Sequence, residues 1–134
     1  MIGNDIIDLE LAQLESNWQR EGFLNKIVTS SEQKLIAKAL DQETMFWYLW
    51  SLKEAAYKIY NRQTQNRAFM PLRLECYAVE SKETVLHAKV SCEGRIYWTK
   101  TSIVNDCIDT VAVLNESDFD RIVTLESHVV IEKK

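Results

Sequence analysis

Glycine and proline are scarce in this chain, whose 134 residues contain three glycines and one proline. The sequence therefore offers no stretch that resembles a flexible linker, and we expect residues 1–134 to form a single domain. No apolar run approaches the roughly 20 residues that a membrane-spanning helix requires. The first residues have no basic start before an apolar stretch, so we expect no secretory signal.

Cysteine pairs and an excess of positive charge are also missing. The three cysteines are widely spaced and none belongs to a C-x-x-C pair, so the sequence suggests neither a zinc site nor a disulfide framework. We accordingly expect a cytoplasmic location. The formal net charge is −4, from 16 basic and 20 acidic residues, which argues against nonspecific binding to nucleic acid. We expect neither nucleic acid nor a membrane among the partners.

Hydrophobic periodicity predicts a helical first half and a strand-rich second half. Residues 1–7 are rich in β-branched side chains and predict an opening strand. Helical patterns follow at about 8–20, 30–40 and 44–60, the second beginning with a T-x-x-E capping box at Thr29 and Glu32. Strand-like segments then occupy residues 72–80, 84–92, 95–104 and 108–115, with Glu93-Gly94 as a hairpin turn. This order predicts an α+β domain, with an N-terminal strand and three helices followed by an antiparallel sheet.

The third predicted helix is apolar around much of its circumference. Such a helix is expected to be buried, either in the core or against another subunit. Its aromatic side chains could stack on an adenine, but packing in the core or at an interface is the preferred interpretation. These aromatic residues are Phe46, Trp47, Tyr48 and Trp50.

Two segments place charged residues within otherwise apolar patterns. Near the N-terminus, Asp5 and Asp8 lie three residues apart where the predicted strand meets the first helix. Asp8 is also a good helix N-cap, and Asp5 could be an ordinary acid at a strand end. In the third helix, Glu54 and Lys58 are four residues apart on one face, and Ser51 precedes Glu54 on that face. Taken alone, Glu54 and Lys58 could form a simple solvated ion pair.

Together these segments resemble the paired signature of the 4′-phosphopantetheinyl transferase superfamily. The signature is G-x-D near the N-terminus, followed about 45–50 residues later by W-S-x-K-E-A-x-x-K. Residues 23–32 are similar to the family's F-x-x-x-(hydrophobic)-(hydrophobic)-T-x-x-E stretch, and residues 101–115 resemble its late strand pair more weakly. The chain length is similar to that of the short, holo-acyl-carrier-protein-synthase type. That type implies a homotrimer with active sites between subunits.

The resemblance implies transfer of the 4′-phosphopantetheine arm of coenzyme A to a serine of an apo acyl or peptidyl carrier protein, with release of 3′,5′-ADP. It implies that Asp5 and Glu54 bind Mg²⁺, with Asp8 adding a direct or water-mediated contact. Lys53 and Lys58 would contact the phosphates of coenzyme A as point charges. Glu54 and Lys58 would form the catalytic group, with Glu54 accepting the proton of the serine.

The sequence departs from the family pattern in two places. The family's histidine in the late strand pair has no match, and Asn105 or Asp106 occupies roughly its place. The glycine-containing turn after the second lysine is absent, and Arg62 and Arg67 are expected to offer phosphate contacts in compensation. These departures keep open a catalytically impaired family member that acts as a coenzyme A-binding or interaction protein. A plain α+β structural subunit, with surface charges only, is the third hypothesis.

Overall fold

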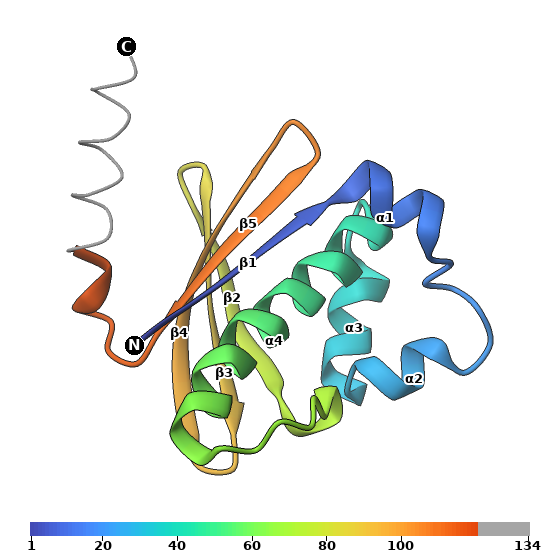
Figure 1. The fold of residues 1–134 in the computed structure, drawn as a ribbon. Coiled ribbons are helices and arrows are strands. Elements are labelled where there is room, and N and C mark those ends of the chain that lie inside the picture. Colours follow the sequence, from blue (N-terminus) through green and yellow to red (C-terminus); the bar gives the residue numbers. More distant parts are fainter. Residues whose placement is uncertain (121–134) are drawn as a thin grey trace.

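The computed structural model describes residues 1–120, which form an antiparallel sheet with helices on one of its sides (Figure 1). The elements, in chain order, are β1 (Ile2–Asp8), α1 (Leu9–Glu15), α2 (Phe23–Ile27), α3 (Ser30–Lys38), α4 (Gln42–Thr64), the 3₁₀ turn η1 (Pro71–Arg73), β2 (Glu75–Lys82), β3 (Val85–Cys92), β4 (Arg95–Val104) and β5 (Cys107–Val113). The predicted α+β class, with an N-terminal strand and helices before the remaining strands, is confirmed.

The sheet pairs the first strand of the described chain with the last strand. Its strand order is β1-β5-β4-β3-β2, and all neighbouring strands are antiparallel. The N-terminal strand β1 therefore lies at an edge, paired only with β5, and Asp5 stands opposite Thr110. Residues of β1 alternate between the side that faces α4 and the open side of the sheet. This alternation presents Gly3 and Asp5 to α4.

Helix α4 forms the centre of the core and runs across the sheet (Figure 1). Phe46, Leu49, Leu52 and Ile59 are fully buried. The ring of Phe46 packs 5.5 Å from that of Trp18 and 4.9 Å from that of Trp47, between centroids, so these aromatic residues serve the core. Within residues 1–120, no helix combines the length and apolar character needed to cross a bilayer.

The helical half differs from the prediction in the number and the bounds of its helices. The described part contains four α-helices, since the expected helix at residues 8–20 ends at Glu15 and the short helix α2 follows. Ser16 adopts an extended backbone that ends α1. Trp18, which fell within the expected helix, lies beyond this end and packs on Phe46 from the loop. Gly22 precedes α2 with a φ of 79°, a conformation that glycine adopts readily.

The strand half follows the expected pattern closely. Ala88, Val90 and Cys92 alternate along β3, within the segment predicted as a strand, and all three are buried. The hairpin between β3 and β4 turns at Glu93 and Gly94, whose φ values of 49° and 81° are both positive. Positive φ at both central residues is the geometry that a tight two-residue hairpin requires.

Candidate functional site

A close contact between backbones brings β1 against α4. A Cβ atom on Gly3 would lie 2.0 Å from the carbonyl oxygen of Ala55. Since no side-chain atom can be accommodated at that distance, glycine is the residue that this approach allows. The glycine of the G-x-D segment thus has a packing reason, and the contact places the next inward-facing residue, Asp5, beside the middle of α4.

Asp5, Glu54 and Lys58 meet at this junction. The Nζ atom of Lys58 lies 3.6 Å from Oδ1 of Asp5 and donates a hydrogen bond of 2.5 Å to the carbonyl oxygen of Asn4. Glu54 lies one turn before Lys58 on the same face of α4. The side chain of Asp5 is 15% exposed and that of Lys58 is 44% exposed, so the acid is sheltered while the lysine reaches solvent.

Burial raises the pKa of both carboxyl groups. For Asp5 the loss of hydration is the largest cause, and the charge of Lys58 opposes it. For Glu54 the loss of hydration comes first, and the negative charge of Asp5 adds to it. The carboxyl of Asp5 thus contributes directly to raising the pKa of Glu54. The structure brings together two acids that are 49 positions apart in the chain, as 54 − 5 gives.

The donor set of this pair suits a hard divalent cation. Oδ2 of Asp5 is buried and has no hydrogen-bond partner among the described residues. A buried carboxylate oxygen without a donor is costly unless a proton or a cation binds it. Mg²⁺ commonly binds one or two carboxylates, with phosphates and waters completing its shell. Within residues 1–120, no group of three or more His, Cys, Asp or Glu side chains is arranged to hold a metal ion.

Asp8 lies outside the junction of Asp5, Glu54 and Lys58. Its Oδ1 atom accepts a 3.1 Å hydrogen bond from the backbone nitrogen of Leu11 and caps the N-terminus of α1. Strand alternation also puts Asp8 on the opposite face of β1 from Asp5. The structure therefore gives Asp8 the capping role that was the alternative from sequence and does not group it with Asp5 and Glu54.

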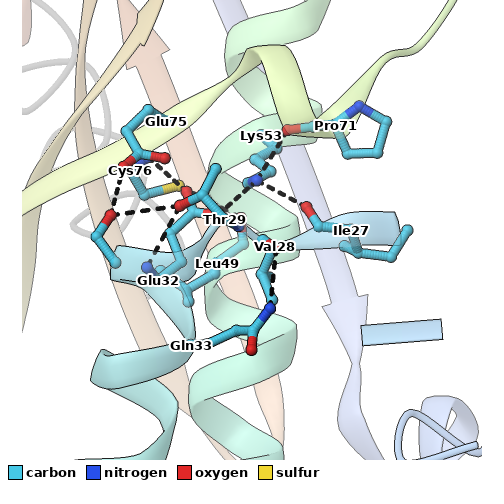
Figure 2. A network of polar contacts seen from close by, with 11 residues as sticks. Ile27, Val28, Thr29, Glu32, Gln33, Leu49, Lys53, Pro71, Glu75 and Cys76 are labelled. Carbon is cyan, nitrogen blue, oxygen red and sulfur yellow. Dashed lines mark hydrogen bonds and ion pairs between the residues drawn. The ribbon is translucent and has the colours of Figure 1, made fainter. Parts of the chain in front are cut away.

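The expectation that Lys53 contacts coenzyme A does not fit this structure. The side chain is fully buried, and its three donors are all used (Figure 2). Nζ lies 2.6 Å from Oε1 of Glu32 and donates hydrogen bonds of 2.7 and 2.8 Å to the carbonyl oxygens of Ile27 and Pro71. Successive residues of a helix point about 100° apart, so Lys53 enters the core while Glu54, the next residue, faces β1.

Glu32 is the residue whose main role the sequence did not reveal. The predicted capping box is confirmed, since Oε1 accepts a 2.8 Å hydrogen bond from the nitrogen of Thr29. The same carboxylate pairs with Lys53, and its Oε2 accepts a 2.6 Å hydrogen bond from the nitrogen of Cys76 (Figure 2). The sequence did contain one indication of this role. Lys53 lies in an apolar helix, and a buried ammonium group requires a buried acid as its partner. Through these contacts, Glu32 of α3 connects this helix to α4 and β2.

An open hollow continues from Lys58 toward the C-terminal end of α4. It has a volume of ≈ 380 Å³ and is lined by Tyr57, Lys58, Asn61, Arg62 and Arg67. Three of these five side chains are cationic and none is acidic. The hollow therefore offers an anionic ligand a positively charged surface next to the two carboxylates.

Arg62 also holds the edge strand. Its Nη1 atom donates a 2.6 Å hydrogen bond to the carbonyl oxygen of Ile2, one turn along α4 from the bond between Lys58 and Asn4. These two cations therefore fasten β1 to α4. For Arg67, the described part of the chain contains no hydrogen bond or ion pair of the guanidinium.

The position of the family's missing histidine is a tight turn. Asn105 and Asp106 connect β4 to β5 with φ values of 51° and 61°, and the carbonyl oxygen of Asp106 accepts a 2.8 Å hydrogen bond from the nitrogen of Leu9. His87 lies on the face of β3 opposite the buried Ala88 and lines a different hollow with Trp98 and Lys100. The described residues thus supply no histidine to the junction of Asp5 and Glu54.

Comparisons with known proteins agree with the fold. A family model described as the 4′-phosphopantetheinyl transferase superfamily matches residues 1–102. Among solved structures, the chain is similar to the holo-[acyl-carrier-protein] synthase of Thermotoga maritima, with a TM-score of 0.58 and 17% sequence identity. That match covers 85% of this chain and 62% of the other, so the present chain spans less than two thirds of that structure. A search of curated proteins finds no match.

Proposed function

Because this chain belongs to the 4′-phosphopantetheinyl transferase superfamily, we propose that it transfers the 4′-phosphopantetheine arm of coenzyme A to a serine of an apo acyl or peptidyl carrier protein. The observation that carries the proposal is the convergence of Asp5 from β1 and Glu54 from α4 beside Lys58. The serine oxygen forms a bond to the phosphorus of the phosphopantetheine arm. The bond from that phosphorus to the bridging oxygen breaks, and 3′,5′-ADP leaves with this oxygen.

Asp5 and Glu54 would hold the Mg²⁺ ion of this reaction. The buried, unpartnered Oδ2 of Asp5 and the raised pKa values of both carboxyls support this assignment. A bound Mg²⁺ ion would neutralise negative charge on the diphosphate oxygens of coenzyme A. Asp8 is left out of the proposed ligand set, since its carboxylate caps α1.

The cationic hollow is the proposed phosphate-binding surface. Lys58 lies at its boundary with the carboxylate pair, and Arg67 lies on its outer wall. Both side chains can donate charge-assisted hydrogen bonds to phosphate oxygens. Arg62 lines the same hollow, and we propose that it contributes positive charge while it holds β1. Lys53 takes no part in binding, because its donors are used in the core.

Glu54 is the proposed acceptor of the serine proton. Burial and the charge of Asp5 raise the pKa of Glu54 in the cation-free site, and a bound cation would favour the carboxylate form that can accept a proton. Lys58 opposes this rise, and its Nζ atom, 3.6 Å from Oδ1 of Asp5, would face the reacting phosphate. The two residues form the proposed catalytic group, with no nucleophile required from this chain.

A homotrimer remains part of the proposal. The open side of the sheet exposes isoleucine side chains on strands at its edge and centre: Ile2 is 47% exposed, Ile6 is 61% exposed and Ile96 is 47% exposed. Burial of such side chains between copies of the chain would remove apolar surface from water. Light scattering on the purified chain tests this point, and a monomer at working concentration would contradict it.

A second candidate is a family member that binds coenzyme A without transferring its arm. Two observations favour it: a tight turn replaces the family's histidine at Asn105 and Asp106, and the core removes Lys53 from the phosphate site. This candidate predicts that coenzyme A and Mg²⁺ raise the melting temperature, because a ligand that binds the native state stabilises it. No carrier protein would then gain mass.

The deciding experiment is incubation with coenzyme A, Mg²⁺ and several apo carrier proteins, followed by mass spectrometry of the carriers. The proposed function predicts a mass gain equal to the phosphopantetheine arm. Asp5→Asn and Glu54→Gln should abolish the gain, while Asp8→Asn should retain it. Undiminished transfer by both site variants would refute the assignment of the two carboxylates.

A further inference from the structure

Ser51 is a buried hydroxyl on the catalytic face of α4. It precedes Glu54 by three residues and Lys58 by seven, a spacing that aligns the three side chains along one face of a helix. Its residue exposure is 0%. A serine in the middle of a helix often returns its hydroxyl to a carbonyl one turn earlier. Ser51 does not do so, and its Oγ atom has no standard hydrogen bond within the described residues.

The second unpartnered atom at this place belongs to Asp5. Its Oδ2 atom is buried and also lacks a standard hydrogen bond among residues 1–120. Successive residues of β1 meet successively earlier turns of α4, since Ile2 contacts Arg62 and Asn4 contacts Lys58. Gly3 packs on Ala55 and Ile59, so the next inward residue, Asp5, lies about one turn earlier on the helix, beside Ser51. Hydrogen bonding to Ser51 also lowers the pKa of Asp5, after the larger effects of burial and Lys58. A buried donor and a buried acceptor that both lack partners are complementary, since each satisfies the other at no cost in exposed surface.

Neighbouring hydroxyls on the sheet are already engaged. Thr110 stands opposite Asp5 in the strand register, but its Oγ1 atom shares a 2.7 Å hydrogen bond with Oγ1 of Thr101. Thr99 donates its hydroxyl to the carbonyl oxygen of Ala88 at 2.9 Å. Ser51 therefore offers Asp5 a buried hydroxyl, on the face of α4 that meets β1, that has no partner among residues 1–120.

We propose that Ser51 is a positioning residue whose hydroxyl donates a hydrogen bond to one lone pair of Oδ2 of Asp5, leaves the other lone pair for the cation shared with Glu54, and so fixes the orientation of this carboxylate. The inference rests on the proposed function, because it assumes that Asp5 binds a cation. The inference adds a residue, Ser51, that holds the proposed metal ligand Asp5 in one orientation. Groups that orient a ligand commonly contribute about 10–100-fold to metal affinity.

The test compares Ser51→Ala with the conservative Ser51→Thr and with Thr99→Val, which removes a buried hydroxyl elsewhere in the core. Binding of Mn²⁺, as a spectroscopic substitute for Mg²⁺, is followed by electron paramagnetic resonance with coenzyme A present. We expect Ser51→Ala to weaken Mn²⁺ binding about tenfold or more. We expect Ser51→Thr to recover most of the affinity and Thr99→Val to bind as the wild type does.

Carrier modification, measured in parallel, separates this inference from the proposed function. Ser51→Ala should raise the Mg²⁺ concentration for half-maximal rate while leaving the rate at saturating Mg²⁺ within a few-fold of wild type. If the wild-type chain binds no cation and modifies no carrier, the proposed function fails. If the wild type does both and Ser51→Ala matches it in Mn²⁺ affinity, the role of Ser51 is overturned while the proposed function stands. Equal loss in Ser51→Ala and Thr99→Val would also overturn it, because a general loosening of the core would then explain both.

Discussion

Gly3 and Ala55 form the contact that sets the geometry of the site, with space for no Cβ atom between them. The contact fixes how closely β1 approaches α4, and thereby how close Asp5 comes to Glu54. A glycine two residues before an acid is therefore a structural requirement for convergence of the two carboxylates.

Gly3→Ala should destabilise the protein by at least about 2 kcal/mol, because the added atom meets backbone rather than a movable side chain. Urea unfolding measures the effect. Ile6→Val, on an exposed position of the same strand, is the matched control and should change the free energy of unfolding by less than about 0.5 kcal/mol. Similar values for the two variants would show that the strand can move away from α4.

The pairing of Asp5 with Glu54 was expected only through the resemblance to the family's paired motif, because no local periodicity relates two residues 49 positions apart. The burial of Lys53 in the core could not be predicted from the sequence. A motif shows which residue types occur together, but it does not show the rotation of a helix relative to its neighbours. The burial of Lys53 depends on Glu32 from another helix and on backbone carbonyls of Ile27 and Pro71, which only the tertiary structure brings together.

The strand half could be predicted almost completely, since alternation in β3 and the turn at Glu93-Gly94 are determined locally. The short helix α2 was missed. Five residues carry too little periodic signal, and Gly22 indicates the end of a helix as readily as the residue before one.

Lys53→Met should cost about 3–5 kcal/mol, because it leaves the carboxylate of Glu32 buried without its cation. The double variant Glu32→Gln/Lys53→Met should recover part of this loss in thermal or urea unfolding. Lys58→Met removes a half-exposed lysine from the same helix and serves as the control, with a much smaller effect. A Lys53→Met protein of wild-type stability but poor coenzyme A binding would instead restore the role first expected for this lysine.

Asp5→Asn should stabilise the ligand-free protein at neutral pH. Burial raises the pKa of Asp5 above its ordinary value of 3.8, so the folded state binds more protons than the unfolded state between the two pKa values. The free energy of unfolding of the wild type therefore falls as the pH rises through the folded pKa. The Asp5→Asn variant shows no such fall, because its amide does not titrate. The two proteins should differ little below about pH 3.8 and diverge above it, as thermal unfolding across pH 3–8 can measure. A less stable Asp5→Asn protein at pH 7 would contradict the assigned direction.

Arg67→Ala should weaken coenzyme A binding about tenfold at low salt, the effect of one charge-assisted hydrogen bond of about 1.5 kcal/mol. Calorimetric titration at two salt concentrations measures it, and added salt should reduce the difference from wild type. Arg20→Ala is the control, because Arg20 stacks on the ring of Phe23 away from the hollow. Equal losses for the two arginines would point to net charge rather than to a contact in the hollow.

The most direct measurement of the central claim is the affinity for coenzyme A with and without Mg²⁺, determined by calorimetry for wild type, Asp5→Asn and Glu54→Gln. Two carboxylates that share a cation with the diphosphate predict that Mg²⁺ tightens binding to the wild type about tenfold or more, a coupling of at least about 1.4 kcal/mol. Both variants should lose this coupling. The same Mg²⁺ enhancement in the variants, or wild-type binding that is indifferent to Mg²⁺, would contradict the account.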